Sequence, residues 1–384
     1  MNSKNILKRT IVITLTGLCA FSSCEDHPKI DNPLQYVLNS KNENIQRVMD
    51  SVSEFEVQIR YTQIDRKDER VVFSDYDFQV DDQNYFYPAS TVKFPAAVAA
   101  LEKLNEIDSL DRNTRFYVEG DSVETTFAKS ISEIFAVSDN DANNRLVEFL
   151  GQDDLNSRMT NRGVTPIRIA HRLGYHSDET ATKPLVVYLN DSTTTIFEGT
   201  INTSPKPLNL NKIKKGMGFY EEDSLMGEPF DFSLKNHYPV ETQHGLLKRI
   251  VFPENFKAKE RFDISEEQRE FLLDAMHTLP KKVGYDPIEY YDGYCKFFMY
   301  GDTKDDIPEH IKIYNKVGWA YGTLTDCAYI VDSKNDIEFM LTATILVNKN
   351  RIFNDDTYEF DEIGIPFLAE LGRLFYDYEF NRKQ

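Results

Sequence analysis

A serine and a lysine three residues apart, Ser90 and Lys93, are the residues of this sequence best suited to covalent chemistry. They open the segment PASTVKFPAAVAALEKL, whose alanines and leucines predict a helix that begins close to Ser90. Positions i and i+3 share a helix face, so the Lys93 amine can reach the Ser90 hydroxyl. The helix dipole and any nearby cation favour a neutral amine. A neutral amine can take the proton of a serine and turn it into a nucleophile.

Two further short motifs supply groups that such a nucleophile needs. Ser138-Asp139-Asn140 lies between two predicted helices, where an Asp or Asn could equally serve as a helix cap. As catalytic groups, Ser138 could pass a proton to the leaving group and the Asn140 amide could bind a substrate carbonyl. Lys316-Val317-Gly318 ends the predicted strand HIKIYNKVG, where a lysine adds positive potential and a glycine admits a close backbone.

In this order the three motifs, S-x-x-K, S-D-N and K-x-G, resemble those of the class A β-lactamases and penicillin-binding proteins. The segments STVKFPAAVAAL, AVSDNDANNRL and KVGWAYGTLTDCAYIV resemble the family beyond the motifs, and the likeness covers roughly residues 41–150 and 240–380. The resemblance implies a serine hydrolase that works by acyl transfer. It assigns catalysis to Ser90, Lys93 and Ser138, and substrate binding to Asn140, Lys316, Gly318 and Trp319. The implied oxyanion hole is the pair of backbone N–H groups of Ser90 and Trp319.

The sequence departs from the family pattern at two places. Val317 stands where the third motif normally carries a hydroxyl residue that helps to bind a substrate carboxylate, and Trp319 replaces a small or hydroxyl residue. The family's Glu-x-x-Leu-Asn segment, whose Glu activates the hydrolytic water, has no counterpart after Arg168. Asp178 and Glu179 are candidates for that base, with solvated loop charges as the alternative. We therefore expect slow deacylation.

The order of predicted elements indicates an α+β fold. A helix near residue 42 precedes the strand segments FEVQIRYTQI and VVFSDYDFQV, and a helical block follows. The strand segments HIKIYNKVG, DCAYIVD and DIEFMLTATILV and the amphipathic helix IPFLAELGRLFYDY complete the chain. We expect one antiparallel sheet flanked by N- and C-terminal helices, with an all-helical subdomain between its strands. Residues 183–235, with a predicted hairpin and many Gly, Pro and Asn residues, indicate an insertion.

The N-terminus has the pattern of an export signal. Basic residues precede an uncharged apolar run, Ile11 to Phe21, which is too short to span a membrane. The run ends at Ser22-Ser23-Cys24, which resembles a bacterial lipobox with Cys24 as the lipidated residue; a plain secretory signal is the alternative. We expect a signal peptide over 1–23, a tether over 24–40 and the hydrolase domain over 41–384, anchored by lipid in the bacterial cell envelope.

Composition excludes several other classes of function. The 63 acidic residues exceed the 44 basic ones, and a net charge of −19 opposes binding to nucleic acid or to an anionic membrane surface. No phosphate loop or dinucleotide motif occurs, and His171 and His176 lack metal-site spacing, so no cofactor or metal is expected. Cys295 and Cys327 could pair, although spacing cannot show that they meet.

The sequence thus predicts an exported monomeric serine hydrolase that acts on a small molecule or peptide, with the membrane contacted only through the lipid. Slow β-lactam hydrolysis is the first expectation. A D-Ala peptidase or esterase, and a non-catalytic peptidoglycan-binding module on the same fold, remain open because one fold hosts many functions.

Overall fold

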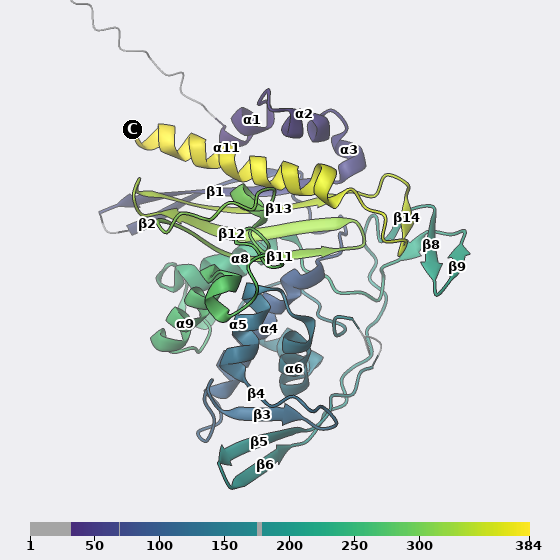
Figure 1. Cartoon of the computed structure of the whole chain (residues 1–384), viewed down its shortest axis with the longest axis vertical. Coiled ribbons are helices and arrows are strands. Elements are labelled where there is room, and N and C mark those ends of the chain that lie inside the picture. Colours follow the sequence, from purple (N-terminus) through teal and green to yellow (C-terminus); the bar gives the residue numbers. More distant parts are fainter. Residues whose placement is uncertain (1–31, 69, 175–178) are drawn as a thin grey trace, which may run out of the picture. The chain divides into compact units, whose positions relative to one another are not determined.

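A five-stranded antiparallel sheet organises the computed structural model, which describes residues 32–68, 70–174 and 179–384. Its strand order is β11-β12-β13-β1-β2, so the N-terminal hairpin pairs with the C-terminal strands through β1 and β13 (Figure 1). The strands are β1 (Gln58–Lys67), β2 (Arg70–Phe78), β11 (Ile311–Ala320), β12 (Thr323–Asp332) and β13 (Ile337–Leu346). Strand β11, which carries the third motif, is an edge strand. Its free edge can therefore pack against an element outside the sheet.

Terminal helices cover one face of this sheet (Figure 1). They are α1 (Pro33–Leu38), α2 (Glu43–Met49), α3 (Val52–Phe55) and the long C-terminal α11 (Ile365–Lys383). Phe367, Leu371 and Phe375 of α11 are fully buried and pack on the apolar side chains of β1, β12 and β13. The amphipathic pattern of the last segment therefore predicts the buried face of α11 correctly.

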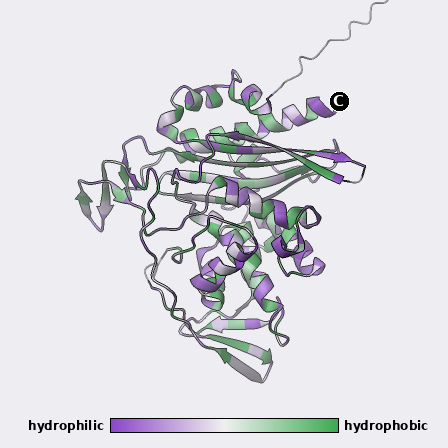
Figure 2. Cartoon of the chain, turned by 180° about the vertical axis from the view of Figure 1, so that it is seen from behind, coloured by the Kyte–Doolittle hydropathy of each residue, from purple (hydrophilic) through white to green (hydrophobic). Residues whose placement is uncertain are grey.

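A block of helices covers the opposite face (Figure 1). It comprises α4 (Lys93–Leu104), α5 (Phe127–Ala136), α6 (Asn140–Leu150), α7 (Gln152–Asn161), α8 (Val240–Val251) and α9 (Glu266–His277). Helix α4 is buried along almost its whole length and forms the axis of the second apolar core. Figure 2 shows apolar residues gathered along the sheet and the inward helix faces, with hydrophilic residues at the outer end of the β1–β2 hairpin. The predicted α+β architecture is confirmed.

Smaller sheets extend from the helical block and from the region predicted as an insertion. Strands β3 (Arg115–Val118), β4 (Thr125–Thr126), β5 (Leu185–Asn190) and β6 (Thr193–Phe197) form a four-stranded sheet, so the hairpin predicted after residue 183 is present. The remaining short strands are β7 (Lys214–Lys215), β8 (Gly218–Glu221), β9 (Ser224–Met226), β10 (Phe230–Asp231) and β14 (Ile352–Phe353). Strand β14 pairs with β8, which joins the insertion to the segment that precedes α11.

The folded unit begins earlier than the sequence predicts. Residues 24–40 are predicted as a tether, but Asn32 caps helix α1 with its side chain, and the compact unit runs from Asn32 to Gln384. Leu34 and Val37 are buried in the core beneath α11, so their apolar character fixes this segment to the domain. Cys24 and the predicted signal lie outside the described residues. No helix in the described part of the chain is long and apolar enough to cross a membrane.

Candidate active site

Ser90 lies in a tight turn that leads into helix α4. The 3₁₀ turn Ala89–Val92 carries the serine, and Lys93 is the first residue of α4, as the sequence predicts. Ala89 has a φ of +47°, a left-handed conformation that costs a non-glycine residue energy and is often found at functional sites. Edge strand β11 packs directly on this turn. A Cβ at Gly318 would lie 2.7 Å from the Pro88 carbonyl oxygen and 2.9 Å from the Ser90 nitrogen.

Lys93 is buried at the start of α4, and its amine is held by the second motif. Its Nζ donates hydrogen bonds to the Ser138 carbonyl oxygen and to Asn140 Oδ1 at 2.7 Å, and it lies 3.3 Å from Ser138 Oγ, whose hydroxyl can donate to a neutral amine. Burial, and then the positive charge of Lys316, lower the pKa of Lys93 well below its usual value. The structure therefore favours the neutral amine, which is the form that accepts a proton.

Ser138 links the first and third motifs. Its hydroxyl accepts a hydrogen bond from Lys316 Nζ at 2.8 Å and lies 3.3 Å from Lys93 Nζ. Burial lowers the pKa of Lys316 to about 8. The backbone at Ser138 also has a positive φ, +59°, and Asp139 caps helix α6 through the Ala142 amide. The capping role considered for this tripeptide thus belongs to Asp139, while Ser138 and Asn140 face the lysines.

A buried polar group supports β11 on its other side. Asn315 Nδ2 donates to Asp326 Oδ1 at 2.8 Å, and Lys296 Nζ donates to Asn315 Oδ1 at 2.7 Å. Asp326 is fully buried, and burial raises its pKa to about 6 although the Asn315 bond opposes this. Buried charges are costly unless they are hydrogen-bonded, so this group fixes the strand that carries Lys316.

A cleft of about 510 Å³ opens above these groups, and its wall includes Ser90, Asn140 and Trp319. Aromatic rings form much of the remaining wall. They belong to Tyr87, His171, Tyr321, Tyr358 and Phe360. The structure therefore brings the three motifs predicted from the sequence to one place, together with aromatic residues that the sequence did not single out.

Val317 and Trp319, the two departures from the motif, both pack on the apolar core on the α11 side of the sheet, and only Trp319 also lines the cleft. Val317 is 1% exposed and packs in the apolar core on the α11 side of the sheet. Trp319 lines the cleft, with its ring edge-on to that of Tyr294 at 5.8 Å. The methyl groups of Val317 therefore belong to the core, while Trp319 lies between this core and the cleft.

The predicted insertion supports the turn that carries Ser90. Phe232 packs between the rings of Tyr87 and Tyr321, at 6.0 and 5.4 Å, and Tyr87 and Tyr321 meet edge-on at 4.9 Å. All three belong to an apolar cluster that also holds Ala89. Aromatic spacing within residues 230–232 was the only available signal in the sequence, and it does not identify the partner rings.

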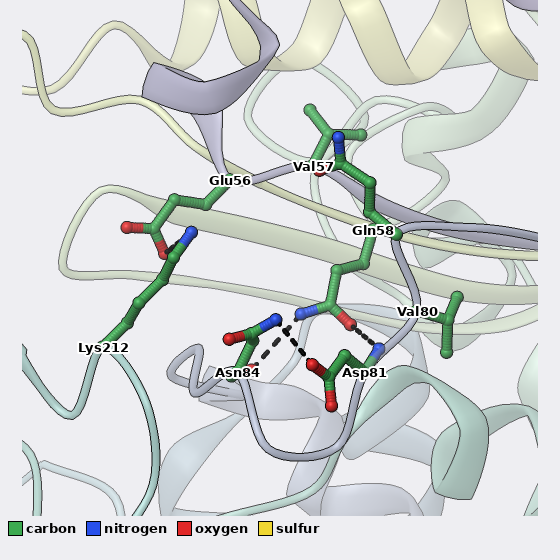
Figure 3. A pocket seen from close by; sticks show the side chains of 8 residues that line it. Glu56, Val57, Gln58, Val80, Asp81, Asn84 and Lys212 are labelled. Atoms are coloured by element: carbon green, nitrogen blue, oxygen red, sulfur yellow. Dashed lines mark hydrogen bonds and ion pairs between the residues drawn. The ribbon is translucent and has the colours of Figure 1, made fainter.

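Backbone hydrogen bonds fasten the same insertion to the segment before Ser90. The amide of Tyr85 donates to Asn211 O at 2.9 Å, and the amide of Asn211 donates to Gln83 O at 2.8 Å. Figure 3 shows the neighbouring cavity, where the Gln58 side chain bonds the backbone at Asp81 and Asn84, and Lys212 faces Glu56 at 3.9 Å. The chain segment that precedes Ser90 is thus hydrogen-bonded to β1 on one side and to the insertion on the other.

Comparison with known proteins agrees with this geometry. Residues 41–206 match the sequence profile of the β-lactamase enzyme family, a span that includes the first two motifs. The matched segment, which is less than half of the chain, is similar to this family.

Solved structures of β-lactamases share the fold of this chain. A class A β-lactamase from Bacteroides cellulosilyticus superposes with a TM-score of 0.52 at 13% identity, covering 90% of this chain and 98% of that one. A β-lactamase from Burkholderia ambifaria gives 0.51 at 15% identity, covering 85% and 95%. One from Sphaerobacter thermophilus gives 0.50 at 12% identity, covering 90% and 96%. No curated protein sequence matches the chain. These structures show that the chain has the β-lactamase fold.

Of the two candidates for a deacylation base, the structure describes only Glu179, which does not line the Ser90 cleft. Glu179 is exposed and lines a separate cavity with Arg172 and Lys183, and Asp178 lies outside the described residues. His171 does line the Ser90 cleft, and burial lowers its pKa to about 4. Its Nδ1 bonds the Arg172 carbonyl oxygen at 2.5 Å and its Nε2 accepts from the Asn236 amide at 3.4 Å, so both ring nitrogens are occupied. His171 is therefore structural, while His176 lies outside the described residues.

The cysteines and acidic groups offer no second chemistry in the part of the chain that the structure describes. Cys295 and Cys327 are both buried and unpaired. Within residues 32–68, 70–174 and 179–384, no group of three or more His, Cys, Asp or Glu side chains could hold a metal ion.

Proposed function

We propose that this protein is a serine acyl hydrolase of the β-lactamase family and forms a covalent intermediate on Ser90. One observation carries the proposal. Lys93, whose pKa is lowered by burial, lies at the start of the helix that follows Ser90, and it meets Ser138 and Asn140, while Lys316 holds the Ser138 hydroxyl at 2.8 Å. This arrangement combines a nucleophile, a neutral base and a proton path, which are the groups that acyl transfer needs.

The steps balance with the residues present. Ser90 Oγ attacks the carbonyl carbon of an amide or ester, and its proton passes to the neutral Lys93 amine. The backbone N–H groups of Ser90 and Trp319 stabilise the oxyanion. Collapse of the tetrahedral intermediate breaks the bond to the leaving nitrogen or oxygen, which receives a proton through Ser138 from the Lys93–Lys316 pair. Water then hydrolyses the acyl-enzyme and restores free Ser90.

We propose a β-lactam as the first substrate class to test, with slow turnover. Among the described residues that line the cleft, Asp356 is the only carboxylate, and Glu179 faces another cavity. General-base help is worth about 10²–10⁴-fold in rate, and no described residue takes the place of the family's Glu-x-x-Leu-Asn glutamate, so we expect deacylation to be the slow step. A D-Ala peptidase or esterase would use the same groups on another acyl donor. A binding module on this fold would form no adduct.

Intact-mass spectrometry of the soluble chain from residue 25 onwards tests this proposal. A fluorophosphonate should add one equivalent to the wild type and none to Ser90→Ala, and a penicillin should leave a persistent adduct. Ser192→Ala, in the exposed β5–β6 turn, is the matched control and should react as the wild type does. Labelling of Ser90→Ala would exclude Ser90 as the nucleophile, and no labelling of the wild type would favour the binding module.

We also propose that the protein is an exported lipoprotein of the bacterial cell envelope, a monomer attached to the membrane only through Cys24. The support is the sequence pattern of residues 1–24. Cys24→Ala should release the protein from membrane fractions or leave its signal uncut. A wild-type protein that is already soluble and begins at another residue would contradict the lipid anchor.

A further inference from the structure

The cleft continues from Ser90 past the end of β11 to the loop 354–360, which precedes α11. Trp319 on β11 and Tyr321 in the turn after β11 line one side of it. Tyr358 and Phe360 line it from the loop, with their rings 5.3 Å apart. Asp356 lines the same region. A carboxylate among aromatic rings is the chemistry that binds an ammonium group, because ring faces and carboxylates both attract cations.

Asp356 differs from the aspartate beside it. Asp355 accepts hydrogen bonds from Asn350 Nδ2 at 2.6 Å and from the Thr357 amide at 3.0 Å, so the loop uses it as an internal brace. Asp356 is exposed, and its carboxylate makes no hydrogen bond or ion pair with any described residue. It is therefore available to a ligand in the cleft.

The loop that carries Asp356 is held in position before any ligand binds. Phe353, at its start, is 1% exposed and packs on Phe230 and Phe232 of the insertion. The Asn354 amide donates to the Tyr358 hydroxyl at 2.9 Å, and Asn354 Nδ2 donates to Tyr220 O at 3.1 Å. A carboxylate on a fixed loop binds its partner at a lower entropic cost than one on a mobile loop.

Cationic side chains also lie along this cleft, and they must be weighed against Asp356. Arg172 is held by Glu148 through bonds of 2.6 and 2.8 Å, so its charge is balanced within the protein. Lys235 lines the same wall and offers positive charge that would favour an anionic substrate instead. The aromatic rings favour a cationic over an anionic substrate group, because ring faces attract a cation and do not attract a carboxylate.

We propose that the cleft selects acyl donors that carry an ammonium group, bound by Asp356 and the aromatic rings of Trp319, Tyr321 and Tyr358. The inference rests on the proposed acylation of Ser90 and names the substrate class of that site. The substrate is then an amine-bearing amide or ester, such as a peptide with a free amino group. This differs from a substrate recognised only by its carboxylate.

Three alkyl fluorophosphonates of equal length, ending in an ammonium, a methyl or a carboxylate group, test the inference on the wild-type chain from residue 25 onwards. In each, Ser90 Oγ displaces fluoride from phosphorus, and the rate of mass gain measures recognition of the tail. We expect the ammonium probe to label Ser90 about tenfold faster than the methyl probe, and the carboxylate probe to be slowest. The preference should weaken as salt concentration rises.

Two matched variants assign the effect to one side chain. Asp356→Asn should bring the ammonium and methyl rates to within about twofold, while Asp355→Asn should keep the wild-type preference. Equal labelling of the wild type by all three probes, or a preference for the carboxylate probe, would overturn the inference and leave the acylation of Ser90 standing. No labelling by any probe would overturn both. A loss of labelling by the methyl probe in Asp356→Asn would show that Asp356 acts in the chemistry and does not select the tail.

Discussion

The three motifs and the region 183–235 contribute to the same cleft in different ways. The motifs supply Ser90, Lys93, Ser138 and Lys316, whose side chains meet through hydrogen bonds. The insertion supplies no catalytic group, yet Phe232 packs under Tyr87 and Tyr321, and Asn211 bonds the backbone that leads to Ser90. Chemistry and positioning are thus divided between segments that are far apart in the sequence. Variants of the two regions should fail in different ways.

The largest effect is expected within the motifs, at Lys93. Lys93→Met removes the proposed base but retains an unbranched side chain of similar length in a site that is fully buried. Labelling of Ser90 by a fluorophosphonate should slow by about 10²–10⁴-fold, followed by intact mass over time. Lys103→Met, further along the same helix, is the control, because Lys103 Nζ bonds Phe149 O and Asp154 and lies away from the cleft. An unchanged rate in Lys93→Met would place the base elsewhere.

A smaller effect is expected where a motif only positions the serine. In Gly318→Ala the added Cβ would lie 2.9 Å from the Ser90 nitrogen, so the turn must move away from β11. A displacement of this kind can reduce the labelling rate by about 100-fold, and overpacking costs about 1–3 kcal/mol in the free energy of unfolding. Gly227→Ala, which has open space around its Cβ, should change neither the rate nor the thermal midpoint. Wild-type labelling by Gly318→Ala would show that the turn tolerates the shift.

The insertion should affect labelling by limiting the motion of the turn that carries Ser90. Phe232→Ala opens a cavity under Tyr87, and we expect labelling to slow by about tenfold, with the free energy of unfolding lowered by about 3 kcal/mol or more. Amide exchange of residues 83–92 should accelerate while that of α11 stays slow. Ile196→Ala is the control, because this side chain of the same region is 55% exposed. If exchange is unchanged over residues 83–92, the insertion does not hold the turn.

The smallest effect concerns the pH dependence of acylation. Lys316, with a pKa of about 8, loses its charge above that pH, so the acylation rate should fall there. Asp326→Asn removes a negative charge that stabilises the charged form of Lys316. The pKa of Lys316 should then fall, and the loss of acylation rate should begin at a lower pH. Lys296→Met removes a positive charge and should move it to higher pH. If both variants show the pH–rate profile of the wild type, another group controls the fall in acylation rate at high pH.

The sequence by itself determined the chemistry and most of the elements. Apolar periodicity predicted the five sheet strands and helix α11, because side-chain spacing follows directly from strand and helix geometry, and alanine and leucine content predicted α4. The motif order predicted which residues would meet, since acyl transfer requires these groups together. The assignment of residues 33–40 to a tether failed because six residues are too few to show which face is apolar.

Only the tertiary structure decided how these residues work. The lowered pKa of Lys93 comes from burial and from Lys316, which is more than two hundred residues away in the chain. Strand β11 brings Gly318 against the Ser90 turn, and the same strand turns Val317 into the core. Asp355 and Asp356 are the same residue type in adjacent positions. Asp356 lines the cleft, whereas Asp355 forms hydrogen bonds within its own loop. Electrostatics and packing depend on distances in space, and sequence spacing fixes those only within a single helix, strand or turn.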